Sequence, residues 1–321
     1  MKYLAYDISH RTTYEYVGSV SVSYHMLRLR PRDLPNQRCL SHALRIEPET
    51  AVISEHRDYF GNAGHFVTVE KAHTRLFVES ISRVAVAPQF VPDADETPPW
   101  DLIRGIVQGD HSGSGLEAME FVYDSPMVKI SGDIADFAKV SFKPRRAVLS
   151  AAVDLTERIF REFAFDPSAT NVSTPVGEVM ENRRGVCQDF AHFQIACLRS
   201  IGVPARYVSG YLETDAPAGK EKLVGTDASH AWVSFFCPGV GWLDLDPTNG
   251  CIPSMRHVTV AWGRDYGDIS PLRGVIQGSG EHTLSVEVDV VAGEETEDPV
   301  LLPAERGGWD SELVSAANDS V

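Results

Sequence analysis

The stretch Gly185-Val186-Cys187-Gln188-Asp189-Phe190-Ala191-His192 places a cysteine directly after a glycine, where the pattern predicts the start of a helix over residues 187–201. Gly202 and Pro204 follow and are expected to end that helix. Free N–H groups and the positive end of the dipole at a helix start favour a thiolate, the nucleophilic form of cysteine. Cys187 is therefore a candidate nucleophile, with a buried thiol that packs like a small apolar group as the alternative.

A cysteine nucleophile needs a base, and the nearest histidine is a poor candidate. His192 lies five positions after Cys187, which puts it about 140° around the helix and on a different face. His230 is better placed, because residues 229–236 read as a strand, residues 237–241 as a turn and residues 242–246 as a returning strand.

This predicted hairpin brings a carboxylate beside the histidine. His230 lies eight residues before Pro238 and Asp246 eight residues after it, so the two should be side by side within about two residues of register. A carboxylate in that position orients an imidazole and stabilises its cationic form. Asp244 shares the face of Asp246 by strand alternation, so spacing alone leaves both open. The two residues could also be an ordinary cross-strand pair.

The rest of the chain divides by pattern. Residues 1–90 read as an antiparallel β module, with strands expected at 12–22, 43–46, 66–69 and 76–86. Residues 91–145 read as a connector with short helices near 119–123 and 130–140. Residues 146–292 are expected to form a catalytic core, with a helix over 147–163 and strands at 205–212, 230–237, 242–246, 258–262 and 283–291. Residues 293–321 are acidic and are expected to fray.

Four segments resemble the transglutaminase-like core in order and spacing. They are residues 185–192, 203–211 (Val-Pro-Ala-Arg-Tyr-Val-Ser-Gly-Tyr), 229–233 (Ser-His-Ala-Trp-Val) and 241–249 (Gly-Trp-Leu-Asp-Leu-Asp-Pro-Thr-Asn). Residues 10–16, 28–32 and 59–62 are similar to the β module that precedes this core in a bacterial subgroup. The resemblance implies an α+β fold: a papain-like or transglutaminase-like core, whose cysteine-bearing helix packs on an antiparallel sheet, after an N-terminal β-sandwich-like module. It also implies Cys187 as nucleophile, His230 as base and Asp246 as the orienting carboxylate.

The chain departs from the animal transglutaminases of this superfamily. Those enzymes have a Gly-Gln-Cys-Trp type of motif where this chain has Gly-Val-Cys-Gln, and the EF-hand spacing for calcium does not occur here. Phosphate-loop, His-Glu-x-x-His and Gly-x-Ser-x-Gly motifs are also missing from the sequence. The five cysteines form no CxxC pair, which fits neither a disulfide framework nor a zinc cage. No cofactor and no metal are expected.

The expected chemistry is acyl transfer on a peptide or protein amide through a thioester. Hydrolysis by a peptidase or amidase is favoured, because nothing in the sequence marks a site for an acceptor amine. Transfer to an amine uses the same triad and stays open. So does a non-catalytic peptide-binding protein, because a fold does not fix a function. The substrate and the oligomeric state are not defined by the sequence.

Composition narrows the partners. The formal net charge of −16 argues against binding to nucleic acid or acidic lipid, which requires clustered basic residues. One basic run, Arg28, Arg30 and Arg32, is expected to be an edge strand whose arginines are solvated or paired with carboxylates. No apolar run approaches the roughly 20 residues that span a bilayer, and no signal-peptide core is evident. A cytoplasmic location is the default expectation.

Overall fold

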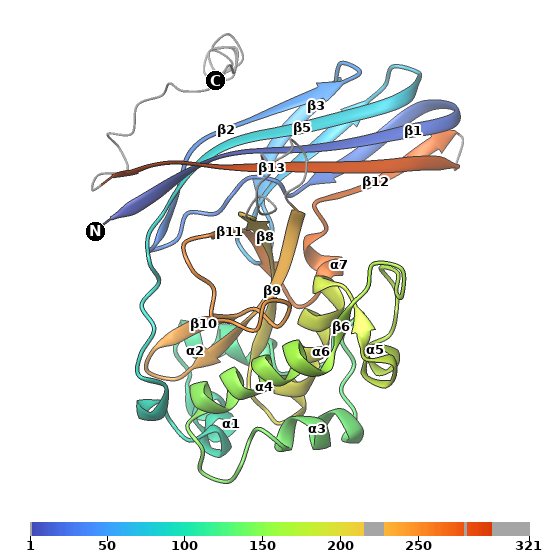
Figure 1. Cartoon of the computed structure of the whole chain (residues 1–321). Helices are drawn as coiled ribbons and strands as arrows, with labels where there is room; N and C mark the ends of the chain where they lie inside the picture. The colour runs from blue at the N-terminus through green and yellow to red at the C-terminus, as the bar shows by residue number, and fades with distance from the viewer. Residues whose placement is uncertain (1, 215–227, 279–280, 297–321) are drawn as a thin grey trace, which may run out of the picture.

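The computed structural model describes residues 2–214, 228–278 and 281–296, and it has two layers (Figure 1). A strand-rich module lies on one side, and a smaller sheet surrounded by helices lies on the other. Within the described residues, none of the helices is long and apolar enough to cross a membrane.

The strand-rich module is one seven-stranded antiparallel sheet built around its first strand. Its strands are β1 (Tyr3–Leu27), β2 (Gln37–Glu47), β3 (Val52–Arg57), β4 (Ala63–Val69), β5 (His73–Val86), β12 (Leu272–Gly278) and β13 (His282–Thr296). The first half of β1 pairs with β5 on one edge and β13 on the other. Its second half pairs with β4 and β12, after a break in register between Glu15 and Val20.

The break in β1 lets the sheet fold over itself. Apolar side chains of β5, such as Leu76 and Val78, share a small core with Val67 and Val69 of β4. The rings of His42 on β2 and His65 on β4 also meet, with centroids 5.5 Å apart. The module is therefore sandwich-like, as expected, and it forms from one continuous sheet.

The second layer holds a four-stranded antiparallel sheet in the order β10-β9-β8-β11. The strands are β8 (Ala205–Leu212), β9 (Ala228–Cys237), β10 (Gly241–Leu245) and β11 (His257–Gly263). The helices are α1 (Trp100–Gly109), α2 (Gly113–Glu120), α3 (Gly132–Lys139), α4 (Val148–Glu162), α5 (Val176–Asn182), α6 (Cys187–Ser200) and α7 (Tyr266–Ile269). Helix α6 packs on β8 and β9, and nearly all of its side chains are buried. The fold is thus the expected helix on an antiparallel sheet.

Residues 91–145 are more than a connector. They contain a 3-10 turn (Ala94–Glu96) and the helices α1, α2 and α3, of which α1 was not expected. Ile103, Val107, Ile134 and Phe137 from these helices join the main core together with α6. The segment therefore belongs to the second layer, and its weak sequence pattern reflects short helices that are each buried on only a few positions.

The expected extent of the catalytic core, to residue 292, needs correction. Strands β12 and β13 leave the second layer and pair with β1, so the strand-rich module consists of two distant parts of the chain. Gly293 belongs to β13 and not to a tail, whereas residues 297–321 lie outside the described residues. Alternation along β13 predicted a half-buried strand correctly, but alternation carries no information about which sheet the strand joins.

Two side-chain amides fasten the module to β11. Gln37 donates to the Thr259 carbonyl at 2.7 Å and accepts from the Thr259 N–H at 2.8 Å. Asn62 does the same at Trp262, donating to its carbonyl at 2.8 Å and accepting from its N–H at 3.0 Å. Because β11 is an edge strand of its sheet, these amides provide hydrogen-bond partners for its outer backbone groups, and the Arg32 N–H also donates to the Thr259 carbonyl at 3.1 Å.

The basic run lies in the loop after β1 and not in an edge strand. Arg28 pairs with Asp58 at 3.0 Å, and Arg30 pairs with Glu55 at 3.1 Å. The guanidinium of Arg32 instead lies 3.4 Å from the ring centroid of Trp262, in the other layer. Arg32 therefore serves the contact between the layers rather than a surface charge.

Candidate active site

Cys187 is the first residue of α6, and the local sequence explains its position. The carboxylate of Asp189 accepts from the Val186 N–H at 2.8 Å and from the Thr170 hydroxyl at 2.6 Å. This contact caps the helix, with the acidic group at its positive end. A side chain at Gly185 would put its Cβ 2.6 Å from Asp189 Oδ2, so only glycine leaves room for the cap. Cys187 is half-buried at this end of the helix.

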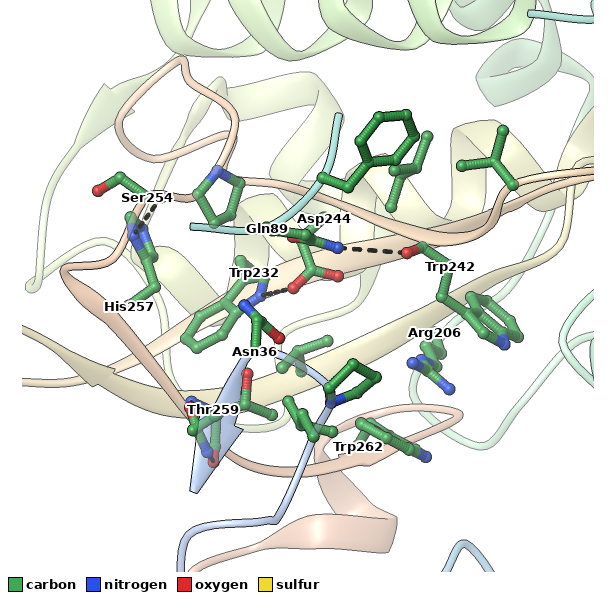
Figure 2. A pocket seen from close by; sticks show the side chains of 18 of the residues that line it. Asn36, Gln89, Arg206, Trp232, Trp242, Asp244, Ser254, His257, Thr259 and Trp262 are labelled. Atoms are coloured by element: carbon green, nitrogen blue, oxygen red, sulfur yellow. Dashed lines mark hydrogen bonds between the residues drawn. The ribbon is translucent and has the colours of Figure 1, made fainter. Parts of the chain in front are cut away.

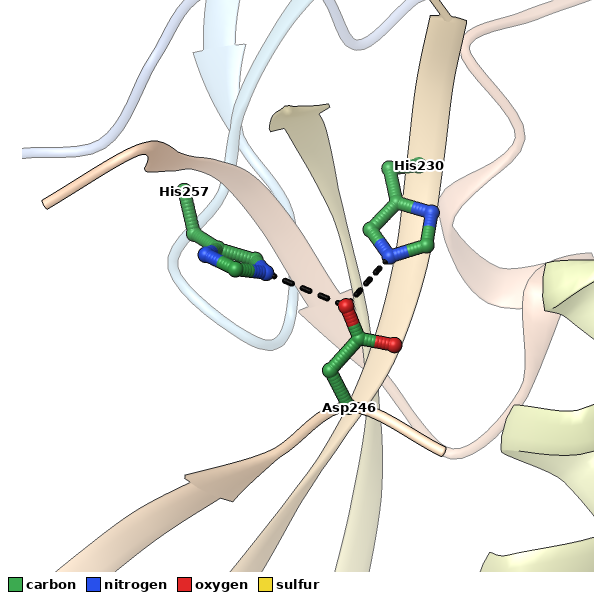
Figure 3. A group of neighbouring side chains, drawn as sticks. All are labelled: His230, Asp246 and His257. Carbon is green, nitrogen blue, oxygen red and sulfur yellow. Dashed lines mark hydrogen bonds and ion pairs between the residues drawn. The ribbon is translucent and has the colours of Figure 1, made fainter. Parts of the chain in front are cut away.

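His230 and Asp246 meet as the hairpin predicted. The Nε2 atom of His230 lies 2.7 Å from Asp246 Oδ2, and both side chains are buried (Figure 3). Since Nε2 is committed to Asp246, Nδ1 is the nitrogen left for Cys187, which lines the same pocket. Asp244 is directed elsewhere and accepts from the Trp232 indole N–H at 3.1 Å. The structure thus brings Cys187, His230 and Asp246 together and separates Asp244 from them.

The Asp246 carboxylate is held by further donors. Its Oδ1 accepts from the backbone N–H groups of Thr248 at 2.9 Å and Asn249 at 3.2 Å. Its Oδ2 accepts from the Asn249 side-chain amide at 2.6 Å and from His257 Nε2 at 3.1 Å. Both oxygens are therefore fixed, and the one that faces His230 cannot rotate away.

His257 donates a hydrogen bond to Asp246, as the partner of its other ring nitrogen shows. The Ser254 backbone N–H donates to His257 Nδ1 at 3.2 Å, a contact drawn in Figure 2. Nδ1 is an acceptor, so the proton of the ring lies on Nε2, which faces Asp246. His230, Asp246 and His257 present nitrogen and oxygen atoms within 4.8 Å of one another. Because hydrogen bonds to Asp246 already occupy the facing nitrogens of both histidines, we interpret the group as a hydrogen-bonded chain rather than a metal site.

The protonation of the pair follows from these contacts. Burial alone would lower the pKa of His230, but hydrogen bonding with Asp246 and Cys187 outweighs it and raises the pKa to about 10. Burial alone would likewise raise the pKa of Asp246, but hydrogen bonds from His230, His257 and Asn249 hold it well below its usual range. The arrangement therefore favours an imidazolium next to an ionised carboxylate across neutral pH.

The pocket that contains Cys187 lies between the two layers. It has a volume of about 270 Å³, and its lining includes Cys187, Gln188, Tyr207 and His230 from the second layer. The strand-rich module supplies a wall through β1, β12 and β13, with the residues His10, Thr12, Tyr14, Leu272, Leu284 and Val286. The module therefore forms part of the pocket, and the two layers share it.

A larger cavity of about 480 Å³ is lined by Trp232 and His257, among other residues (Figure 2). Its lining does not include Cys187, but it does include a stack of Arg206 with the rings of Trp242 and Trp262. The Arg206 guanidinium lies 4.0 Å from the ring centroid of Trp242 and 3.7 Å from that of Trp262. This cavity borders the hydrogen-bonded chain through His257, and its described lining contains no cysteine.

The other cysteines are in different environments. Burial raises the pKa of Cys39 and Cys237 to about 11 and that of Cys197 still further. Cys251 is exposed as a residue, yet partial burial of its side chain and the charge of Asp246 raise its pKa to about 11. These four thiols are thus poor nucleophiles near neutral pH.

Sequence reasoning missed several residues of the site. Asp189 and Gly185 lie within the quoted motif, and an acidic residue three positions after a helix cap was a usable signal. His257 begins a strand and follows no periodic pattern, so nothing in the sequence links it to Asp246. His192 is buried and accepts from the Tyr266 N–H at 3.1 Å, which agrees with its exclusion as the base.

Fold and site together define a transglutaminase-like protein. The family model for the bacterial transglutaminase-like N-terminal region matches residues 6–85. The model for the transglutaminase-like superfamily matches residues 136–247, which include Cys187, His230 and Asp246. The chain belongs to this superfamily.

Individual relatives agree with this assignment. An uncharacterised protein of Mycobacterium tuberculosis (strain ATCC 25618 / H37Rv) is 40% identical over 296 residues, which cover 89% of this chain and 92% of that protein. A protein-glutamine gamma-glutamyltransferase of Pseudomonas aeruginosa is 31% identical over 121 residues, or 37% of this chain and 18% of that protein. The solved structure of a candidate cysteine protease of Cytophaga hutchinsonii has a TM-score of 0.72, with 21% identity and coverage of 92% and 93% of the two chains. That last similarity supports the fold.

Proposed function

We propose that this protein is a cysteine-dependent enzyme that transfers the acyl group of an amide bond, with hydrolysis as the outcome. Cys187 is the nucleophile, His230 the general acid and base, and Asp246 the carboxylate that orients His230. One observation carries the proposal: a buried imidazole, bound through Nε2 to Asp246 at 2.7 Å, lies beside a cysteine at the start of a helix. Nucleophile, base and orienting group are the three roles that thiol catalysis needs.

The proposed reaction has two steps. The Cys187 thiolate attacks the amide carbonyl, the bond from carbon to nitrogen breaks, and the His230 imidazolium gives its proton to the departing amine. A thioester then joins the acyl group to Cys187. Water attacks this thioester and gives a proton to His230. The carboxylic acid departs and the thiolate and imidazolium are restored. The backbone N–H of Cys187, at the helix start, is proposed to stabilise the oxyanion.

Hydrolysis is favoured over transfer to an amine by the lining of the pocket. Cys187 is half-buried and Ser229 is exposed, so water can reach the thioester. Among the described lining residues, none is an aspartate or glutamate that would bind an alkylammonium group. Transfer to an amine is the second candidate, because a relative matching part of this chain is named a protein-glutamine gamma-glutamyltransferase.

Hydrolysis and transfer to an amine are distinguished by the product that each forms. A panel of peptide amides is incubated with the protein, with and without an excess of a primary alkylamine, and the products are identified by mass spectrometry. We expect the free acid in both mixtures, and its loss in Cys187→Ala but not in Cys251→Ala. A new amide as the main product would replace hydrolysis with transfer. Binding of peptides without any Cys187-dependent product would instead favour a non-catalytic peptide-binding protein.

A further inference from the structure

Strand β13 of the strand-rich module presents a row of apolar side chains that passes from the core to the pocket. On β13, Leu284, Val286, Val288 and Val290 alternate with outward-facing residues. Their partners on β1 are Tyr14, Thr12, His10 and Ile8, in the same order. Residues two apart on a strand share a face, so these four pairs form one continuous surface directed at the second layer.

The row changes from buried to exposed where it reaches Cys187. Val288 and Val290 are each 1% exposed and belong to the main core. Leu284 is 53% exposed and Val286 is 47% exposed, although both lie on the same face and line the pocket. The apolar pattern thus continues beyond the point where the protein itself covers it. Apolar surface left open at such a place gains free energy when an apolar group covers it.

The wall around this exposed part carries no fixed charge. Apart from Cys187 and His230, the described lining has no aspartate, glutamate, lysine or arginine. His10 lies on the wall with its Nδ1 3.1 Å from the Tyr211 hydroxyl. Burial lowers the pKa of His10 to about 4, so it is uncharged at neutral pH. A charged group placed against this wall would meet apolar surface and no oppositely charged side chain among the wall residues.

From this surface we infer that the Tyr14–Leu284 and Thr12–Val286 pairs form a specificity wall for an uncharged, apolar substrate side chain next to the reacting carbonyl. The inference rests on the proposed function and defines its substrate class: amides whose acyl part carries an aliphatic or aromatic group. It also gives the strand-rich module a role that the catalytic layer alone cannot perform, because both pairs come from β1 and β13.

The test uses chloromethyl ketones, which alkylate an active-site thiol without needing turnover. Five probes carry Leu, Phe, Gln, Asp or Lys next to the reacting carbonyl, and iodoacetamide serves as the probe without a side chain. The rate of Cys187 modification is measured by mass spectrometry for the intact chain. We expect the Leu and Phe probes to react about tenfold or more faster than the Asp and Lys probes, as for other hydrophobic pockets. Equal rates for all five overturn the inference.

Paired variants of β13 locate the preference. Leu284→Asp adds a carboxylate to the wall, and Ser285→Asp adds one to the neighbouring residue on the opposite face. We expect Leu284→Asp to slow the Leu and Phe probes and to speed the Lys probe, each measured relative to the iodoacetamide rate of the same variant. Ser285→Asp should behave as the unaltered chain. Preferences that survive Leu284→Asp contradict the wall. Slow iodoacetamide modification of Cys187 in the unaltered chain would count against the proposed function instead.

Discussion

The imidazole of His257 donates from Nε2 to Asp246 Oδ2, at 3.1 Å, and this is the oxygen that also holds His230. A donor to a carboxylate disperses its charge and makes it a weaker base. His257 thereby limits how strongly the Asp246 carboxylate stabilises the protonated form of His230. A general acid that must release its proton to a departing amine benefits from that limit.

Replacement of His257 tests this relationship. In His257→Phe the ring remains but the donor is lost, so Asp246 attracts the His230 proton more strongly and the pKa of His230 should rise. We expect amide turnover to fall roughly tenfold, part of the factor that general acid catalysis provides. Titration of the His230 ring by NMR measures the shift.

Two controls accompany this variant. His257→Gln keeps an N–H donor near the position of Nε2 and should restore both the titration and the turnover. His65→Phe replaces an equally buried histidine, at 8% exposure like His257, on a strand distant from Cys187 and should change neither. An unaltered His230 titration in His257→Phe would leave His257 with a packing role only.

Asp246→Asn should move the basic limb of the pH profile. Catalysis needs the His230 imidazolium, whose pKa of about 10 results from hydrogen bonding with Asp246 and Cys187 against the opposing effect of burial. Activity of the unaltered chain is therefore expected to persist below pH 10 and to fall as the pH rises through it. Without the Asp246 charge, burial lowers the His230 pKa, and the limb moves to lower pH. Turnover should fall by about 10⁴, as in the corresponding Asp→Asn change of a Ser-His-Asp triad.

Asp244→Asn is the matched control, because Asp244 lies on the same hairpin but accepts from Trp232 rather than from His230. Its pH–rate profile should keep the basic limb near that of the unaltered chain. A limb that moves in Asp244→Asn and stays in place in Asp246→Asn would assign the orienting role to the wrong carboxylate.

Gly185→Ala should shift the position of Cys187 indirectly, through the cap of α6. The new Cβ would lie 2.6 Å from Asp189 Oδ2 and displace the cap of α6. Loss of a helix cap costs about 1–2 kcal/mol, and a shifted nucleophile costs roughly a hundredfold in turnover. Gly177→Ala is the control, since no atom lies within 4 Å of its Cβ position in α5 and alanine favours the helix by about 1 kcal/mol. Equal turnover in both variants would show that the Asp189 cap does not position Cys187 for catalysis.

Gln37→Met should weaken the contact between the two layers. The Gln37 amide accepts from the Thr259 N–H and donates to the Thr259 carbonyl, and methionine can do neither. The carbonyl keeps the Arg32 N–H as a donor at 3.1 Å, so the N–H is the group that loses its partner. One buried N–H without a partner predicts a loss of about 1–3 kcal/mol in the free energy of unfolding. Denaturant titration measures it, with Gln277→Met on exposed β12 as the control. A loss no larger than that of the control would show that the amide is replaceable by water.

The features that the sequence could predict are local. The hairpin of β9 and β10 depends on two strands and one turn, so the register of His230 and Asp246 followed from counting residues. Cys187 at the start of α6 followed from the glycine before it and the helical pattern after it. The choice between Asp244 and Asp246, by contrast, required the resemblance to a family. Strand alternation places both on one face. In the structure Asp244 lies within β10, opposite Ser234, whereas Asp246 follows the end of β10 and contacts His230.

The features that the sequence could not predict depend on contacts between distant residues. Pairing of β13 with β1 joins Tyr14 to Leu284 across 270 positions, and alternation alone does not select that partner. The same pairing creates the wall beside Cys187, so the wall was invisible as well. His257 begins β11 and Asp246 follows β10, and these strands are the two edges of the sheet. Their contact therefore depends on the order in which all four strands assemble.

The central claim, that Cys187 is activated by His230, is tested most directly by iodoacetamide labelling of each cysteine as a function of pH. The exposed Cys251, with its pKa of about 11, provides an internal reference in the same sample. We predict rapid labelling of Cys187 well below pH 7, slowed in His230→Ala and unchanged in His65→Ala. If Cys187 instead follows an ordinary thiol, with labelling that rises near about pH 8.5 in all three proteins, the triad is not assembled and the account is wrong.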